Sequence, residues 1–246
     1  MGNLMTNLSV NLNKIALLRN ARGRDFPNVV NFAEKFMGLG VRGITVHPRQ
    51  DERHITVKDT IELGELLSGN TDVEFNIEGY PSEEFLSLVE STKPAQCTLV
   101  PDSPDQLTSD HGWDLVKHGK FVKEICSQLS HAGIRTSIFL DPDIEQVNLA
   151  RETGTNRIEL YTEAYAASYR TPKNEIVFEK YKKVSLEAQK LGLGVNAGHD
   201  LDLLNLAKFL TIHNILEVSI GHVLTIECIE QGMESVIKKY LNVCNG

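Results

Sequence analysis

Two kinds of segment alternate along the chain. Short runs rich in Val, Ile, Leu and Thr are followed by longer segments whose apolar residues recur every three or four positions, as on one face of a helix. The short runs predict β-strands at 8–12, 43–47, 73–77, 96–100, 135–140, 157–160, 193–196 and 216–220. The longer segments predict helices at 31–39, 57–67, from 82, 114–132, up to about 153, from about 174, 201–209 and 225–241.

This alternation predicts a single α/β domain over residues 1–246. A helix between two strands returns the chain to the same end of the sheet, so successive strands are parallel. Eight such units close into a (β/α)8 TIM barrel, which typically needs roughly 250 residues. The alternative is an open doubly wound sheet, which usually has a glycine-rich turn after its first strand. This chain reads Asn11-Leu-Asn-Lys14 there, which favours the barrel.

Two connections are irregular. A polar loop at about 101–114 follows the fourth strand, and loops of this length in a compact domain are usually lids or binding loops. A mobile surface loop is the alternative for this segment. A short insertion is predicted at about 163–173.

Composition and charge exclude several classes of protein. With 25 basic and 33 acidic residues the net charge is −8, which argues against a general nucleic-acid or anionic-membrane binder, so any anion site must be local. No apolar run approaches the ~18 residues of a membrane span, and the first residues lack the order of a signal peptide. The scattered cysteines predict free thiols in a reducing cytoplasm: Cys97, Cys126, Cys228 and Cys244.

Candidate catalytic residues cluster where the predicted strands end. In a barrel of this kind the chemistry lies at the carboxyl ends of the strands. Four of the eight histidines fall there, namely His47, His54, His199 and His222, and Glu78 ends the third strand. A carboxylate and imidazoles in one cavity form an acid–base set, because burial and mutual charge shift their pKa values. Individually, each histidine could instead be structural, and Glu78 could be a salt-bridge partner of Arg49.

Candidate anion-binding residues lie at the same end. Arg22, Arg49 and Arg53 could donate paired hydrogen bonds to phosphate oxygens. The turns after strands seven and eight contain Gly198-His199-Asp200 and Gly221-His222, where barrels commonly bind phosphate at a helix N-terminus. Thr108, in the middle of the predicted lid, could contact a bound ligand. Solvated surface arginines and plain turn glycines are the alternatives.

Long sequence blocks at these positions resemble a known family. The chain is similar to the pyridoxine 5′-phosphate synthases of the deoxyxylulose-dependent vitamin B6 pathway over nearly its whole length. The blocks are Val10-Asn11, Leu18-Arg-Asn-Ala-Arg-Gly23, Gly43-Ile-Thr-Val-His47, Arg49, Asp51-Glu-Arg-His54, Asn76-Ile-Glu78, Lys93-Pro94, Leu99-Val-Pro101, Val195-Asn-Ala-Gly-His199 and Ile220-Gly-His222.

The resemblance implies a TIM barrel that forms homo-oligomers, commonly octamers, and needs no metal or organic cofactor. Its small-molecule substrates would be 3-amino-2-oxopropyl phosphate and 1-deoxy-D-xylulose 5-phosphate, condensed to pyridoxine 5′-phosphate, phosphate and water. By the matching motifs, His47 and Glu78 would accept protons and His199 would donate one. The aminoketone phosphate would be held by Asn11, Arg22, Asp200, Gly221 and His222, and the deoxyxylulose phosphate by Arg49, His54 and Thr108.

The chain also departs from the family pattern. Many members read Asn-x-Asp-His after strand one, where this chain has Asn13 and Lys14, and a His-Thr-Gly turn after strand six is replaced by Tyr161-Thr162-Glu163. Asp200 replaces a glycine and Glu227 an arginine.

Three alternative functions remain open. They are a metal-dependent epimerase with His47, Glu78 and His199 as ligands, a Schiff-base aldolase acting through Lys14, and a non-catalytic anion-binding scaffold.

Overall fold

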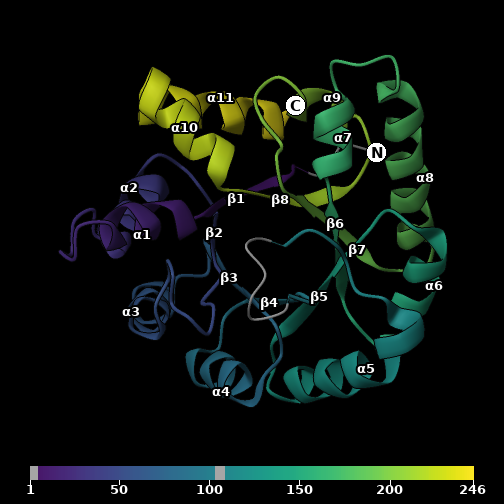
Figure 1. The fold of residues 1–246 in the computed structure, drawn as a ribbon, viewed down its shortest axis with the longest axis horizontal. Coiled ribbons are helices and arrows are strands. Elements are labelled where there is room, and N and C mark those ends of the chain that lie inside the picture. Colours follow the sequence, from purple (N-terminus) through teal and green to yellow (C-terminus); the bar gives the residue numbers. More distant parts are fainter. Residues whose placement is uncertain (1–4, 103–108) are drawn as a thin grey trace.

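The computed structural model describes residues 5–102 and 109–246, and its centre is a closed barrel of eight parallel strands (Figure 1). Each strand pairs with the next in the sequence, and β8 pairs with β1. The predicted (β/α)8 barrel is therefore confirmed. The strands are β1 Asn7–Asn11, β2 Gly43–Val46, β3 Glu74–Gly79, β4 Gln96–Leu99, β5 Arg135–Leu140, β6 Arg157–Tyr161, β7 Gly194–Gly198 and β8 Ile215–Ile220.

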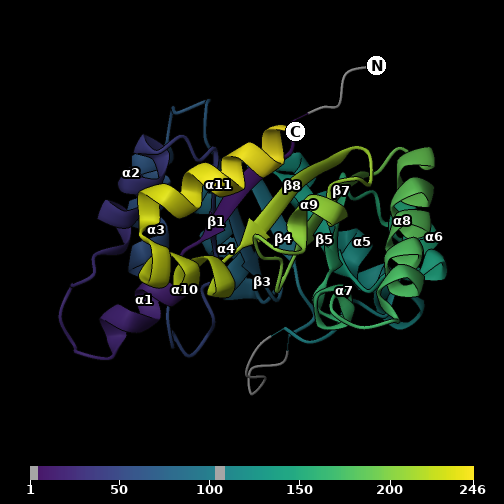
Figure 2. The ribbon, with the colours of Figure 1, turned by 90° about the horizontal axis from the view of Figure 1, so that it is seen from above.

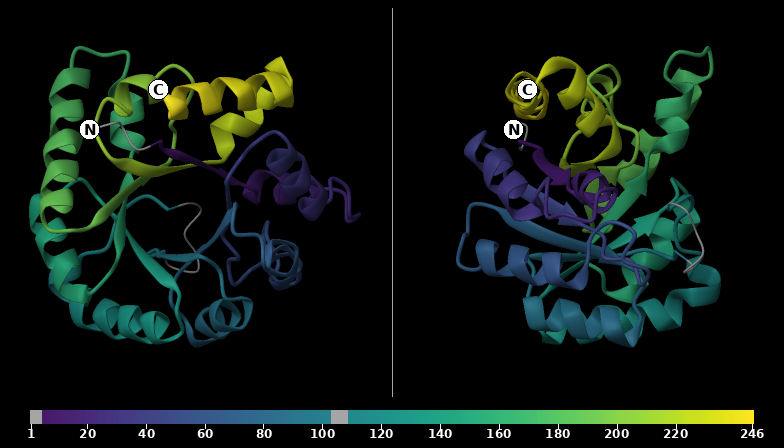
Figure 3. Two further views of the ribbon diagram at one scale, coloured as in Figure 1. Left: turned by 180° about the vertical axis from the view of Figure 1, so that it is seen from behind. Right: turned by 60° about the vertical axis from the view of Figure 1, so that its left-hand side comes forward.

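Helices surround the barrel on the outside, and Figure 3 shows this arrangement from two further directions. They are α1 Asn13–Asn20, α2 Val29–Gly38, α3 Val57–Leu67, α4 Glu83–Thr92, α5 Leu115–His131, α6 Ile144–Thr153, α7 Glu163–Ser168, α8 Asn174–Lys190, α9 Leu206–Phe209, α10 His222–Gln231 and α11 Met233–Asn245. Several begin at a side chain that accepts a hydrogen bond from the first turn: Asn28, Thr56, Ser82, Asp114 and Asp143.

The predicted helices differ from the structure in four places. The helix expected at 201–209 is only the short α9, Leu206–Phe209. Helix α1 was not predicted, because its eight residues expose Leu17 and Leu18 and so lack one clear apolar face. The expected insertion at 163–173 contains the short helix α7. The single helix expected at 225–241 is two helices, since Gly232 adopts a φ of 86° between α10 and α11.

The interior of the barrel is polar. Ser9 and Thr45 share a hydrogen bond of 2.7 Å, and Thr98 donates to Asn76 at 3.0 Å. Asn196 on β7 donates to Gln96 on β4 at 3.3 Å, and since these strands are not neighbours, the bond crosses the interior. Apolar side chains such as Leu8, Val10, Ile44, Val46 and Ile77 instead belong to the core cluster shared with the helices. Charged groups inside the barrel are therefore surrounded by few water molecules and many fixed dipoles.

Helix α11 closes the fold on the side of β1 (Figure 2). The N–H of Thr6 donates to the carbonyl of Cys244 at 3.1 Å, which joins the end of this helix to the start of β1. All four cysteines are free thiols, as predicted. Within residues 5–102 and 109–246, no helix combines the length and apolar character needed to cross a bilayer.

Candidate active site

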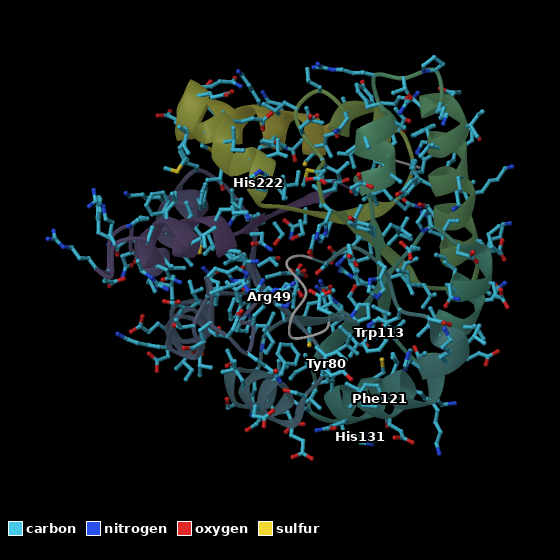
Figure 4. The ribbon with its side chains drawn as sticks, in the orientation of Figure 1. Arg49, Tyr80, Trp113, Phe121, His131 and His222 are labelled. Atoms are coloured by element: carbon cyan, nitrogen blue, oxygen red, sulfur yellow. The ribbon has the colours of Figure 1, made fainter. Side chains whose placement is uncertain are left out.

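The carboxyl ends of the strands bring most of the predicted site residues to one rim. Asn11 ends β1, His47 follows β2 directly, Glu78 is near the end of β3, and His199 follows β7. His222 begins α10, directly after Gly221. Figure 4 labels Arg49 in the opening of the barrel and His222 farther out, at the start of α10.

Glu78 is a buried carboxyl group with a raised proton affinity. Only 7% of the residue is exposed, and Asn11 Nδ2 donates to its Oε2 at 3.4 Å. The pKa of Glu78 is raised to about 8: burial is the largest cause, the nearby carboxylates of Glu217 and Asp102 contribute, and Arg49 opposes the shift. A group that titrates near neutrality can both take up and release a proton during a reaction.

His47 is a buried imidazole with a lowered proton affinity. Its backbone N–H donates to Asn13 Oδ1 at 3.0 Å, and its ring centroid is 6.3 Å from that of His54. Burial lowers the pKa of His47 well below its ordinary value, and the positive charge of Arg49 lowers it further. A neutral imidazole has a free nitrogen lone pair, so His47 is ready to accept a proton.

His199 is held in an unusual backbone conformation. Its φ is 78° and that of Asp200 is 57°, both in the left-handed region that favours glycine. Asp200, which stands where family members often have glycine, thus keeps a glycine-like backbone, and aspartate tolerates this better than most residues. The ring of His199 packs against Phe139 and Tyr161, with each pair of centroids 5.1 Å apart.

The pKa of His199 depends on its burial and on the charges beside it. Burial lowers its pKa, whereas Asp200 and Asp102 raise it. Its Nδ1 is buried and has no hydrogen-bond partner among the described residues. The pKa of His199 is thus lowered overall, and the negative charges beside it oppose that shift.

A buried ion pair and a cavity lie beside these groups. Arg49 pairs with Asp102, and only 8% and 3% of their side chains are exposed. Ser109 also donates to Asp102, at 2.7 Å. A cavity of about 320 Å³ opens next to this pair, lined by His47, Pro48, Arg49, Gln50, Tyr80, Ser82, Phe85, Pro101 and Asp102. The imidazole of His47 and the guanidinium of Arg49 thus line the same cavity.

His54 has one ring nitrogen occupied by the backbone. The N–H of Ile55 donates to His54 Nδ1 at 2.9 Å, which leaves the proton of the neutral ring on Nε2. The pKa of His54 is lowered to about 4, by burial first and then by the positive charges of Arg49 and Lys14. The Nε2–H group is then a neutral donor in a region of positive charge, which suits a phosphate oxygen.

Gly221 permits a close approach between two strands. A Cβ atom at this position would lie 3.0 Å from the Cβ of Asn11. Gly221 precedes the first turn of α10, where free N–H groups and the helix dipole favour an anion. Gly198 is even more restricted, because a Cβ there would overlap Glu159 Oε1.

Not every predicted residue joins this group. Arg22 is exposed in the segment after α1, and among the described residues its side chain has no ion-pair partner. Arg53 pairs with Asp51 at 2.6 Å. Thr108 and the adjoining part of the predicted lid, residues 103–108, lie outside the described residues. From the rest of that loop, Trp113 Nε1 donates to the carbonyl of Leu99 at 2.9 Å.

Sequence reasoning missed three acidic residues near the site. Asp102 holds Arg49, and Glu159 and Glu217 are buried inside the barrel. Burial raises the pKa of Glu159 well above its ordinary value, with further contributions from Glu78 and Glu217. The available signal was an acidic residue between two apolar residues of a predicted strand, at 157–160 and at 216–220.

The family model for "Pyridoxal phosphate biosynthesis protein PdxJ" matches residues 8–246 of the chain. The chain belongs to the PdxJ family. A pyridoxine 5′-phosphate synthase from Christiangramia forsetii is 49% identical over 240 residues, which cover 97% of this chain and 99% of that protein. One from Bacteroides thetaiotaomicron is 51% identical over 240 residues, with the same coverage of each protein. The resemblance inferred from the motifs is confirmed.

Solved structures of other proteins share the fold. The tryptophan synthase A-subunit of Pyrococcus furiosus superposes with a TM-score of 0.64 at 14% identity, covering 96% of each chain. The YdjI aldolase of Escherichia coli K12 gives a TM-score of 0.58 at 11% identity, covering 98% of this chain and 88% of that one. At this level of identity the likeness supports the barrel alone.

Two departures from the usual PdxJ pattern have a structural explanation. Glu227 does not extend freely from α10: Tyr240 Oη donates to it, and so does the N–H of Leu203, at 3.3 Å. It thereby joins α10, α11 and the segment after β7. Tyr161 supplies a wall of the His199 ring pocket.

Proposed function

We propose that this chain is a pyridoxine 5′-phosphate synthase, which condenses 3-amino-2-oxopropyl phosphate with 1-deoxy-D-xylulose 5-phosphate to form pyridoxine 5′-phosphate, phosphate and water. The observation that supports this most is the PdxJ family match over residues 8–246. The convergence of His47, Glu78 and His199 on one rim agrees with acid–base chemistry at that end of the barrel.

The chemistry requires proton transfers. The amine of one substrate can form an imine with the ketone of the other, so the enzyme needs no lysine of its own. Dehydration, phosphate loss and ring closure then each move a proton at carbon or oxygen. In this proposal the neutral imidazole of His47 and the deprotonated carboxylate of Glu78 accept protons, and His199 donates one. Each positioned acid or base contributes roughly 10² to 10⁴ in rate, and a site that excludes water protects the imine intermediates.

The two phosphates have separate proposed positions. Asn11, Arg22, Asp200, Gly221 and His222 would hold the aminoketone phosphate, and Arg49, His54 and Thr108 the deoxyxylulose phosphate. The N-terminus of α10 and the Nε2–H of His54 support these two positions respectively. A phosphate dianion near His199 raises its pKa, so substrate binding itself would charge the proton donor.

A direct assay tests the function. The two substrates are mixed with enzyme and a metal chelator, and both the absorbance of the pyridine ring and the release of phosphate are followed. We expect both signals in the presence of chelator. Loss of activity that an added metal restores would favour the epimerase-like alternative. A Lys14→Met variant that keeps its activity would eliminate the aldolase alternative.

The pH dependence of kcat/KM should reflect Glu78. A base must be deprotonated to act, so kcat/KM should rise with pH and level off above the pKa of about 8. Because Glu217 raises this pKa, Glu217→Gln should move the midpoint to lower pH. Titration of a substrate group would leave the midpoint unchanged in that variant, which would contradict the assignment to Glu78.

We also propose a cytoplasmic homo-oligomer, in line with the family resemblance. Exposed apolar side chains on α1, the segment after it, α3 and α10 support an interface on that side of the barrel: Leu17, Leu18, Phe26, Ile61 and Ile229. Light scattering coupled to gel filtration should give a mass of about eight chains. Free thiols fit a reducing compartment.

A further inference from the structure

We propose that helix α1 is a positioning element for the β2–α3 segment, holding it near His47 with its first residue and near His54 with its last two. This inference rests on the proposed roles of His47 and His54 in the synthase reaction. None of the α1 residues involved needs to touch a substrate.

The first contact is made by Asn13. Its Oδ1 accepts the backbone N–H of His47 at 3.0 Å, and its own N–H donates to Asn11 Oδ1 at 3.0 Å. Asn11 Nδ2 in turn donates to Glu78 Oε2 at 3.4 Å. A continuous chain of hydrogen bonds thus joins Glu78 to the backbone of His47 through the start of α1. The aspartate common in the family has the same acceptor oxygen, so asparagine can preserve this contact.

The second contact is made by the end of α1. Asn20 Nδ2 lies 3.1 Å from the carbonyl oxygen of Arg53 and 2.8 Å from that of His54. Arg19 Nη2 also donates to the carbonyl of His54, at 3.3 Å. The backbone on both sides of the Arg53–His54 peptide bond is therefore held by side chains from one turn of α1.

Arg19 is itself held rigidly. Its guanidinium makes two hydrogen bonds to Asp59, one of them 2.7 Å long, and the two residues are 8% and 4% exposed. Asp59 also accepts from the backbone N–H of Thr56 at 2.8 Å and completes the capping box of α3. The end of α1, the start of α3 and the His54 backbone thus form one connected unit.

This unit determines where the His54 ring points. With the carbonyl of His54 held by α1 and its Nδ1 bonded to Ile55 N–H, Nε2 is the ring nitrogen that remains for a ligand. Burial lowers the pKa of this ring, Arg49, Lys14 and Arg53 add to the shift, and Asp51 opposes it. A helix of eight residues is about 12 Å long, which is a suitable length to brace a segment at two separate points.

Asn20→Ala tests whether α1 positions the His54 backbone. Asn20 is exposed, so its replacement should leave the fold intact. Losing its hydrogen bonds should raise KM for the deoxyxylulose phosphate about tenfold, with kcat and the KM for the aminoketone phosphate within about twofold of wild type. Asn148→Ala, at an exposed asparagine of α6, is the matched control and should change none of these values. Equal kinetics for both variants would overturn the proposal.

A second measurement does not depend on activity. The C2 proton of His54, followed by NMR, should titrate near its pKa of about 4 in the wild type and closer to about 6.5 in Asn20→Ala, since a released ring gains solvent. An unchanged pKa of His54 in Asn20→Ala would contradict the positioning role of α1, even if the synthase assay succeeds. If the assay fails for the wild type, this titration still decides the structural claim.

The Asn13 contact has its own test. Asn13→Ala removes the acceptor of the His47 N–H and should lower kcat about tenfold, whereas Asn13→Asp retains an oxygen and should recover most of the activity. Equal loss in the alanine and aspartate variants would show that the amide group, rather than the acceptor oxygen, is required, which would contradict this part of the proposal.

Discussion

Glu78→Gln should lower kcat by about 10² to 10⁴, because glutamine keeps the size of the side chain and its hydrogen-bonding oxygen but cannot accept a proton. The residue is almost fully buried at the barrel rim, and burial raises the pKa of its carboxyl group to about 8. Steady-state kinetics with both substrates, at a pH near that value, would measure the effect. Thermal unfolding at neutral pH should be little changed, since a carboxyl group with a pKa of about 8 is mainly uncharged there and glutamine is a neutral side chain of the same size.

Glu74→Gln is the matched control for this experiment. Glu74 lies on the same strand, faces the opposite end of the barrel and pairs with Arg135. Its pKa is lowered: burial raises it, but the bonds from Arg135 outweigh that effect. The variant should retain kcat within about threefold, since the carboxylate touches none of the proposed site residues. Equal losses in the two variants would mean that Glu78 acts through the structure of the barrel instead of through proton transfer.

Asp59→Asn should destabilise the folded chain by about 3–5 kcal/mol, because it leaves the guanidinium of Arg19 buried without its counter-charge. Both side chains are nearly inaccessible, at 10% and 6% exposure. For a domain of this size each kcal/mol lowers Tm by roughly 2–4 °C. Chemical denaturation and calorimetry would measure the loss.

The effect of this substitution should also depend on pH. Burial raises the pKa of Asp59, but bonds from Arg19 and Thr56 more than compensate, so the pKa of the folded state is lowered. A lowered pKa adds stability that is present above the unfolded value of about 3.9 and is lost as pH falls through the folded value. The difference in the free energy of unfolding between wild type and Asp59→Asn should therefore become smaller at acidic pH. Glu234→Gln, in an exposed pair with Lys238, should leave the stability unchanged within the error of the measurement, because solvent screens such a pair.

The prediction of the fold succeeded because its signals are local and repeated. Each strand is a short β-branched run, and each long helix has a regular apolar face and, in several cases, a polar cap such as Thr56 or Ser82. Helix α1 was not predicted, because it is short and partly exposed. The division of the last helix into α10 and α11 at Gly232 was not predicted, because one glycine does not by itself end a helix.

The site was predicted in outline for a different reason. Parallel strands all end at one rim, so the order of residues in the chain was sufficient to bring His47, Glu78 and His199 to the same face of the barrel. The roles assigned to individual substrate contacts stay predictions, and Arg22 is exposed in the segment after α1.

Strand order, parallel direction and the chemical types present at the rim thus follow from patterns within short stretches of the chain. Three features do not follow from such local patterns. They are the pairing of Arg49 with Asp102, the burial of the carboxyl groups of Glu159 and Glu217, and the hydrogen bonds from Arg19 and Asn20 to the His54 backbone. They arise between residues distant in the sequence, and their energies depend on separation and on the exclusion of water. Both quantities exist only once the barrel has closed, because a side chain's solvent and neighbours are set by its packing.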